Sequence, residues 1–234
     1  MKKYKRIVLK VSGEALAGGQ NHGICNDGVV QVAQQIKKVV DLGVQVGVVV
    51  GGGNFWRGRT CDDMNRATAD YIGMMATVMN GLALGEGLTA VGVKNKVVSS
   101  LAMEKVCETF FLPNVLKYLS EGYVVIFVGG TGSPFFSTDT CASLRACEIG
   151  ADALFCSKAI DAVYDSDPAT NPNAVRFDEV TFDKIIADNL KVLDLTSVAM
   201  CREFDMPVVV YGKNEPDGLL RLLQGEKLGT IIHK

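Results

Sequence analysis

The chain has 234 residues, 48% hydrophobic and 21% charged, a balance typical of a globular protein that buries a full core. Its formal net charge of −2 excludes a global basic field for nucleic acid or an anionic membrane. No segment approaches the ~20 apolar residues of a membrane span, and Lys10 interrupts the apolar run behind the basic N-terminus, so no signal peptide is expected.

Runs rich in valine and isoleucine predict strands, because continuous apolar character is typical of strands covered on both faces. They are residues 6–11, 44–50, 89–93, 123–128, 151–157, 207–211 and 229–233. Helical patterns separate them, over residues 26–42, 65–84, 139–149 and 194–204. This alternation predicts an α/β fold, with a mainly parallel sheet between helices and a single domain over residues 1–234.

A Pro- and Asn-rich stretch and the spacing of the cysteines bear on domain organisation and on metal sites. The Pro- and Asn-rich stretch 165–175 is interpreted as a surface loop rather than a domain boundary, because strand signals resume after it. The seven cysteines show no C-x-x-C spacing, which argues against zinc and thioredoxin-like sites. We therefore expect reduced thiols in a cytoplasmic protein.

Three of the predicted strands run directly into glycine, in the turns SGEA (12–15), GGGN (51–54) and GGTG (129–132). In open α/β sheets the ligand crevice lies beyond the carboxyl ends of the strands, and glycine there lets backbone N–H groups approach a phosphate. Tight turns also use glycine for packing alone. Three such turns in one chain nevertheless favour a phosphate-binding rim.

The standard nucleotide fingerprints GxxxxGK[ST] and GxGxxG are absent, which argues against P-loop and dinucleotide-binding proteins. Lys10 interrupts the first strand, either as a strand end emerging into water or as an ammonium aimed at a phosphate chain. His22 lies in a glycine-rich loop and His233 next to the C-terminus, so no histidine-based mechanism is assembled. Phosphoryl transfer to an acceptor that is itself a phosphate needs no base.

Seven segments in chain order resemble the bacterial UMP kinases of the amino-acid-kinase family. They are KVSGEAL (10–16), GVVVGGGNFWRG (47–58), ADYIGMMATVMNGLA (69–83), GTGSPFFSTDT (130–140), DAVYDSDP (161–168), LKVLDLTS (190–197) and GEKLGT (225–230). The resemblance implies a three-layer α/β/α sandwich, a homohexamer, and reversible transfer of the ATP γ-phosphoryl to UMP with Mg²⁺. It also places the product UDP in pyrimidine nucleotide biosynthesis, with UTP as inhibitor and GTP as activator.

Carried over position by position, the resemblance implies three sets of site residues. The catalytic set is Lys10, Asp139 and Asp194, whose carboxylates orient the lysine or the metal. The ATP-binding set is Lys10, Val11, Ser12, Gly13, Gly53, Arg57, Lys158, Tyr164 and Asp167. The UMP-binding set is Gly52, Asp70, Thr131, Gly132, Ser133, Pro134, Phe135, Phe136, Ser137 and Thr138. No direct side-chain metal ligand is assigned. Asp161, Asp165 and Asp167 are spaced like calcium ligands, but the glycine and distal glutamate of a calcium loop are missing.

The chain departs from the family pattern in two places. In CSKAIDAVY, Lys158 stands where a small polar ATP contact is usual, and Ala162 replaces a glycine. Gly85 and Thr89 stand where some relatives carry cations for GTP, so activation by GTP is left open. The candidate GTP residues are Gly18, Gly19, Gln20, Asn21, His22, Gly23 and Lys96.

Simpler interpretations of the acidic residues stay open. Asp70 lies in a Met-rich helix whose apolar stripe suits a core or a subunit interface. Asp139 suits the first turn of a helix, and Asp194 suits a helix N-cap. A non-catalytic nucleotide sensor or metal-oxoanion store, and another enzyme of the same family, are the alternatives to a UMP kinase.

Overall fold

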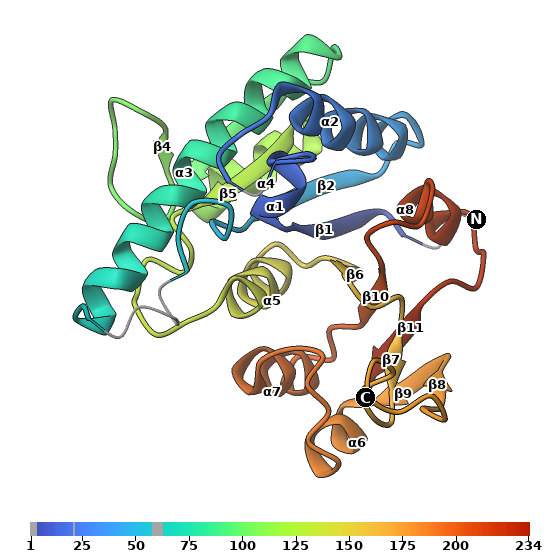
Figure 1. The fold of residues 1–234 in the computed structure, drawn as a ribbon. Coiled ribbons are helices and arrows are strands. Elements are labelled where there is room, and N and C mark those ends of the chain that lie inside the picture. Colours follow the sequence, from blue (N-terminus) through green and yellow to red (C-terminus); the bar gives the residue numbers. More distant parts are fainter. Residues whose placement is uncertain (1–3, 21, 58–62) are drawn as a thin grey trace.

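The computed structural model describes residues 4–20, 22–57 and 63–234 (Figure 1). In this part of the chain the central sheet has nine strands, in the order β4-β3-β5-β2-β1-β6-β10-β11-β9. They are β1 (Arg6–Val11), β2 (Gln45–Val50), β3 (Asn95–Ser99), β4 (Glu108–Thr109), β5 (Val124–Val128), β6 (Ala153–Lys158), β9 (Glu179–Thr181), β10 (Val208–Gly212) and β11 (Thr230–His233). Every pair is parallel except β10 with β11, which confirms the predicted mainly parallel sheet.

Helices cover both faces of this sheet. One face carries α1 (Gly13–Leu16), α2 (Asn26–Asp41), α3 (Arg66–Ala90) and α8 (Gly218–Leu223). The other carries α4 (Leu112–Ser120), α5 (Thr138–Glu148), α6 (Phe182–Ala187) and α7 (Leu195–Glu203). Successive side chains of a strand point to opposite faces, so Ile7 and Leu9 enter one core and Val8 the other. The predicted three-layer α/β/α arrangement is confirmed.

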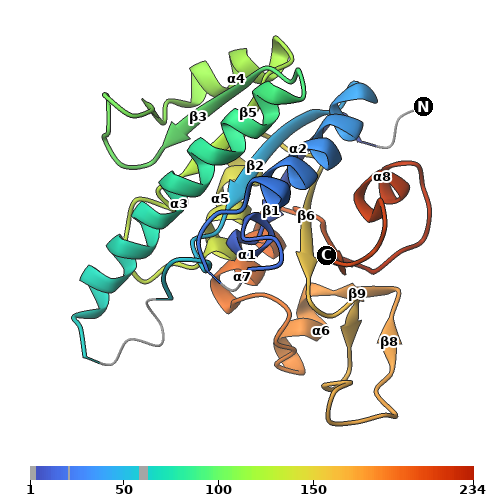
Figure 2. The ribbon, with the colours of Figure 1, turned by 45° about the horizontal axis from the view of Figure 1, so that its top comes forward.

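Small residues let the long helix α3 lie close to its neighbours, and Figures 1 and 2 show it beside α2. A Cβ added at Gly81 would lie 2.2 Å from Val128 Cγ1, and one at Gly87 would lie 2.5 Å from Val29 Cγ1. Both glycines are therefore required by the packing of α3 against β5 and α2, although glycine weakens an isolated helix.

This packing also explains the one strand prediction that is wrong. Residues 89–93 end helix α3 and form the turn after it, and the strand follows as Asn95–Ser99. The helix predicted over 65–84 accordingly continues to Ala90. The other predicted strands and helices are confirmed within a few residues at their ends.

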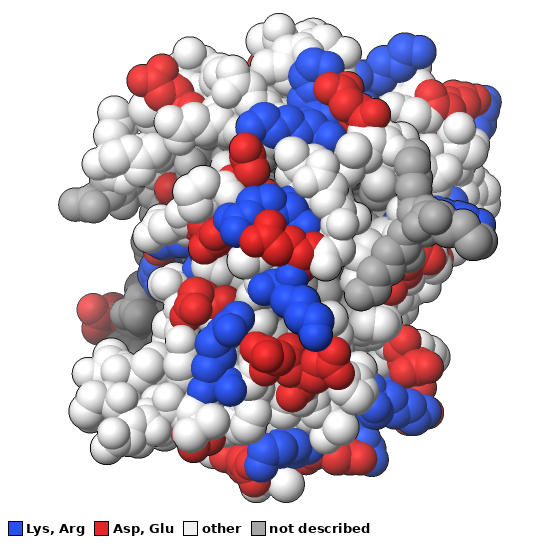
Figure 3. All heavy atoms as spheres, turned by 90° about the vertical axis from the view of Figure 1, so that its right-hand side faces the viewer, with Lys and Arg blue, Asp and Glu red and all other residues white. Residues whose placement is uncertain are grey.

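The stretch 165–175 joins β7 (Val163–Tyr164) to β8 (Arg176–Phe177), which pair as a small antiparallel sheet. The chain then returns to the main sheet through β9. The stretch is a loop, as predicted, and the single domain remains a prediction. On the face shown in Figure 3, lysines and arginines are interleaved with acidic residues, as the small net charge suggests. Across the described ranges, no helix is long and apolar enough to cross a bilayer.

Candidate active site

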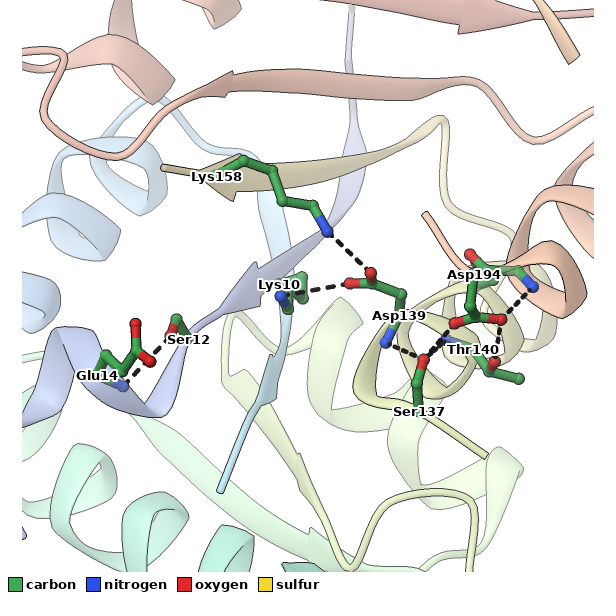
Figure 4. A network of polar contacts seen from close by, with 10 residues as sticks. Lys10, Ser12, Glu14, Ser137, Asp139, Thr140, Lys158 and Asp194 are labelled. Carbon is green, nitrogen blue, oxygen red and sulfur yellow. Dashed lines mark hydrogen bonds and ion pairs between the residues drawn. The ribbon is translucent and has the colours of Figure 1, made fainter. Parts of the chain in front are cut away.

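Two lysines from neighbouring strands meet one carboxylate at the carboxyl edge of the sheet (Figure 4). Lys10 lies near the end of β1 and Lys158 ends β6, and these strands pair in parallel. Their Nζ atoms lie 3.3 Å from Asp139 Oδ1 and 2.8 Å from Asp139 Oδ2, respectively. All three side chains are at most 22% exposed, so this centre carries a net positive charge shielded from water.

The ionisation of this centre follows from its contacts. Burial acts to raise the pKa of Asp139, but the ammonium groups of Lys10 and Lys158 outweigh it and hold that pKa below its usual value. Burial acts to lower the pKa of Lys158, but the charge of Asp139 raises it overall. At neutral pH Asp139 is therefore a carboxylate and Lys158 an ammonium group.

Asp194 has a different place from the one expected of a residue that orients Lys10. It caps helix α7, where Oδ1 accepts from the Ser197 N–H at 2.9 Å and from Thr140 Oγ1 at 2.8 Å. Its Oδ2 accepts from Ser137 Oγ, which also caps α5. Asp194 thus ties α7 to the first turn of α5, the turn that carries Asp139. The N-cap interpretation is confirmed, and the catalytic assignment remains a prediction.

A pair of buried amides underlies the glycine turns after β1 and β2. Asn54 Nδ2 donates to Asn80 Oδ1 at 2.9 Å, and Asn80 Nδ2 donates to Asn54 Oδ1 at 2.7 Å. Asn80 also donates to the Gly51 carbonyl at 2.7 Å, which fixes the GGGN turn to α3. A Cβ on Gly13 would lie 2.3 Å from Asn54 Oδ1, so the turn after β1 must carry glycine.

Sequence reasoning missed this amide pair, although a signal was available. Asn80 is a polar residue in a stretch of α3 that is otherwise apolar or small, and it is fully buried. A buried polar side chain requires partners, so such an asparagine marks a position where a helix holds another backbone.

The loop after β5 is held from α3 as well. Asp70 accepts from the Phe135 N–H at 2.8 Å and from Arg66 Nε at 3.0 Å. Phe135 adopts a φ of 72°, a region that a bulky side chain rarely occupies, so this bond stabilises an unfavourable backbone. The structure therefore brings Asp70 to the predicted UMP loop.

A cavity of about 460 Å³ lies between this loop and the first two glycine turns. Its lining includes Lys10, Ser12, Gly13, Gly52, Gly53, Arg57, Asp70, Thr131, Ser133, Phe136, Ser137 and Thr138. Phe136 thus borders the cavity, whereas Phe135, Pro134 and Gly132 are not part of its lining, and residue Phe135 is 65% exposed. Trp56 borders the same cavity.

A second cavity, of about 640 Å³, opens on the other side of Lys158. It is lined by Tyr164 and Asp167 from the β7–β8 connection and by apolar residues such as Leu190 and Val192. Arg57 lies away from it and forms an ion pair with Glu14 beside the first cavity. Tyr164 and Asp167 thus line this second cavity, whereas Gly13, Gly53 and Arg57 line the first. The predicted ATP-binding residues Lys10, Val11, Ser12 and Lys158 together line a third cavity, of about 410 Å³.

The candidate GTP residues do not come together within one chain. The backbone of Gly23 forms hydrogen bonds with Asn54 beside the glycine turns, and the His22 ring lies edge-on to the Phe55 ring. Lys96 instead lies near the amino end of β3, paired with Val125, and its Nζ sits 5.4 Å from the Tyr118 ring centroid. Asn21, which is also predicted to contact GTP, lies outside the described residues.

Glycine turns and two lysines lie together at the carboxyl edge of a mainly parallel sheet, beside the cavities. This arrangement is typical of α/β proteins that bind phosphorylated ligands. The model of the amino acid kinase family matches residues 5–212, and the chain belongs to this family. Among solved structures, it is similar to the UMP kinase from Bacillus anthracis, with a TM-score of 0.95 and 33% identity over 98% of this chain and 96% of that one. The UMP kinase from Ureaplasma parvum gives a TM-score of 0.93 and 38% identity over 98% and 99%.

Proposed function

We propose that this protein is a UMP kinase, which transfers the γ-phosphoryl group of ATP directly to UMP and releases UDP and ADP. One observation carries the proposal: Lys10 lines the cavity of the 130–138 loop, Lys158 lines the cavity of Tyr164, and Asp139 binds both lysines. A transferring phosphoryl group between the two cavities would lie beside both ammonium groups. The family and the two UMP kinase structures support this assignment.

The two cavities suit two different nucleotides. In the first, the hydroxyls and backbone of the 130–138 loop suit the acceptor phosphate, Phe136 offers an apolar wall for a pyrimidine, and Asp70 suits the ribose hydroxyls. In the second, Tyr164 and the apolar residues around it suit adenosine, with the ATP phosphates directed towards Lys158 and Lys10.

The chemistry requires neutralisation of charge rather than a base. The acceptor phosphate oxygen is already deprotonated at neutral pH, so in-line attack on the γ-phosphorus needs positioning. Lys10 and Lys158 stabilise charge on the transferring oxygens, while glycine N–H groups hold the phosphates in place. Asp139 keeps both ammonium groups oriented, and Asp194 holds the turn that carries Asp139.

Mg²⁺ fits this site as an ion brought by the ATP phosphates. Asp139 Oδ1 is buried and lies 3.3 Å from Lys10 Nζ, so it is one hard oxygen near the place where the ATP phosphates would bring the ion. The described ranges contain no cluster of three metal-ligating side chains, which suits an ion held mostly by phosphate oxygens. When bound, Mg²⁺ supplies additional positive charge at the phosphates.

We further propose a cytoplasmic homohexamer that UTP inhibits and GTP activates. The exposed side of α3 carries an apolar stripe, Tyr71, Ile72, Met75, Met79 and Leu82, which suits contact with another copy of the chain. Light scattering should give six chain masses for the wild type and a smaller assembly for Met79→Lys. A monomeric wild type would contradict the hexamer.

A coupled assay of steady-state turnover tests the activity, with ATP as donor and UMP, CMP, dCMP or carbamate as acceptor. UMP should be the preferred acceptor, and CMP turned over well above UMP would contradict the uridine assignment. Complete absence of turnover together with nucleotide binding would favour a sensor. Repeating the assay with GTP and UTP tests the regulation.

A further inference from the structure

Helix α5 buries an arginine behind the 130–138 loop. Arg145 is 4% exposed, and its guanidinium carbon lies 3.8 Å from the centroid of the Phe110 ring. Nη1 donates to Glu148, but Nε has no hydrogen-bond partner among the described residues. Burying a cation is unfavourable unless its contacts compensate, and packing alone would be served equally well by an apolar side chain. The contact of the remaining nitrogen is therefore informative.

That nitrogen begins a short chain of hydrogen bonds towards the loop. Arg145 Nη2 donates to Ser100 Oγ at 2.8 Å, and Ser100 Oγ donates to the Gly130 carbonyl at 2.6 Å. A hydroxyl has one proton, and a guanidinium can only donate. The arginine therefore directs the Ser100 proton to Gly130, and its charge strengthens that bond.

Gly130 is the first residue of the loop and has a φ of 56°. The loop packs tightly at this point, because a Cβ on Gly132 would lie 3.2 Å from the Ser100 carbonyl oxygen. On the other side, the Gly129 N–H donates to Thr77 Oγ1 at 2.8 Å. The base of the loop is thus held between α3 and the end of β3, with Arg145 behind Ser100.

We propose that Arg145 is a positioning residue for the acceptor nucleotide, which acts through Ser100 on the carbonyl of Gly130 and so sets the direction of the loop's N–H groups. The inference rests on the proposed function, in which this loop binds UMP. Arg145 lines neither of the two nucleotide cavities. Through Arg145, the loop is connected to helix α5, which also carries Asp139.

Ser100→Ala is the sharpest test, because it removes the relay and leaves Arg145 with Glu148 and Phe110. We expect the KM for UMP to rise about tenfold, as for loss of a charge-assisted bond, while the KM for ATP and the melting temperature stay close to wild type. Arg145→Lys should raise the KM for UMP similarly. The KM for UMP of the double variant should not exceed that of the more affected single variant, because both substitutions remove the same contact.

Arg221→Lys is the matched control, since Arg221, like Arg145, is an arginine paired with glutamate but lies on α8, outside the lining of both proposed nucleotide cavities. It should leave both KM values unchanged. A Ser100→Ala enzyme with a normal KM for UMP would overturn the relay alone, as would equal rises in both KM values. A wild type without UMP turnover would overturn the proposed function and the relay with it.

Discussion

Lys158 and Asp139 are joined by a 2.8 Å hydrogen bond between the last residue of β6 and the first turn of α5. The bond connects the edge of the sheet to the helix that follows the 130–138 loop. Because Lys10 lies on the other oxygen of the same carboxylate, both cations hold fixed positions before any phosphate enters. Preorganised charge of this kind stabilises a transition state without reorganisation at the moment of reaction.

Replacing Lys10 with alanine should lower kcat by about 10²–10⁴-fold, because a charge contact made to the transferring phosphoryl group is lost. UMP should still bind. Trp56, the single tryptophan of the chain, borders the proposed UMP cavity, so its fluorescence reports binding separately from turnover. Near-normal kcat in this variant would remove Lys10 from the mechanism.

Asp139→Asn should lower the free energy of unfolding at pH 7 by about 3–5 kcal/mol, because two partly buried ammonium groups lose their carboxylate. Urea unfolding followed by far-UV circular dichroism measures this change. Unchanged stability would show that the lysines find other partners.

The same variant should alter the dependence of stability on pH. The folded-state pKa of Asp139 is lowered, so its contribution is fully present above the unfolded-state value of about 3.9 and is lost as pH falls through the lower folded-state pKa. The pKa of Lys158 is raised, so its contribution is present below about 10.4 and is lost as pH rises through the folded value. Asp139→Asn should therefore show a weaker loss of stability than wild type at both extremes.

Asn80→Ala should destabilise the protein by about 1–3 kcal/mol, because the buried Gly51 carbonyl and the Asn54 amide each lose a partner. The double variant with Asn54→Ala should be less destabilised than the sum of the single variants, since the two amides bond to each other. Chemical denaturation of the wild type, the two single variants and the double variant gives the four free energies of this double-mutant cycle. Strict additivity would contradict the mutual pairing.

Two glycines of α3 should respond to alanine in opposite directions. Gly81→Ala places a methyl group 2.2 Å from Val128 Cγ1 and should destabilise by about 1–3 kcal/mol. Gly73→Ala meets nothing nearer than Trp56 Cδ1 at 3.8 Å and should stabilise by about 0.5–1 kcal/mol through helix propensity. Thermal unfolding of both variants tests the pair, and a shift of the same sign in both would contradict the packing of α3 described here.

The periodicity of apolar residues predicted most of the sheet and the long helices, because continuous burial leaves a strong local pattern. It misplaced the end of α3, where the local sequence TAVGV favours a strand, while the glycines before it pack the helix against β5 and α2. The short helices and the edge strands are not predicted, because a segment of a few residues is too short to show whether its apolar residues repeat with the period of a helix or of a strand.

For the site, local sequence patterns were enough to indicate the chemistry: glycine turns after three strands, Lys10 beside the first, and motifs typical of the family. Which groups contact one another depends on the folded arrangement of the strands and helices. It placed Lys158 on Asp139, Asp194 on the caps of α5 and α7, and Phe136 rather than Phe135 on the cavity. These relations join residues far apart in the chain, and they depend on strand order and helix packing, which leave no local pattern in the sequence.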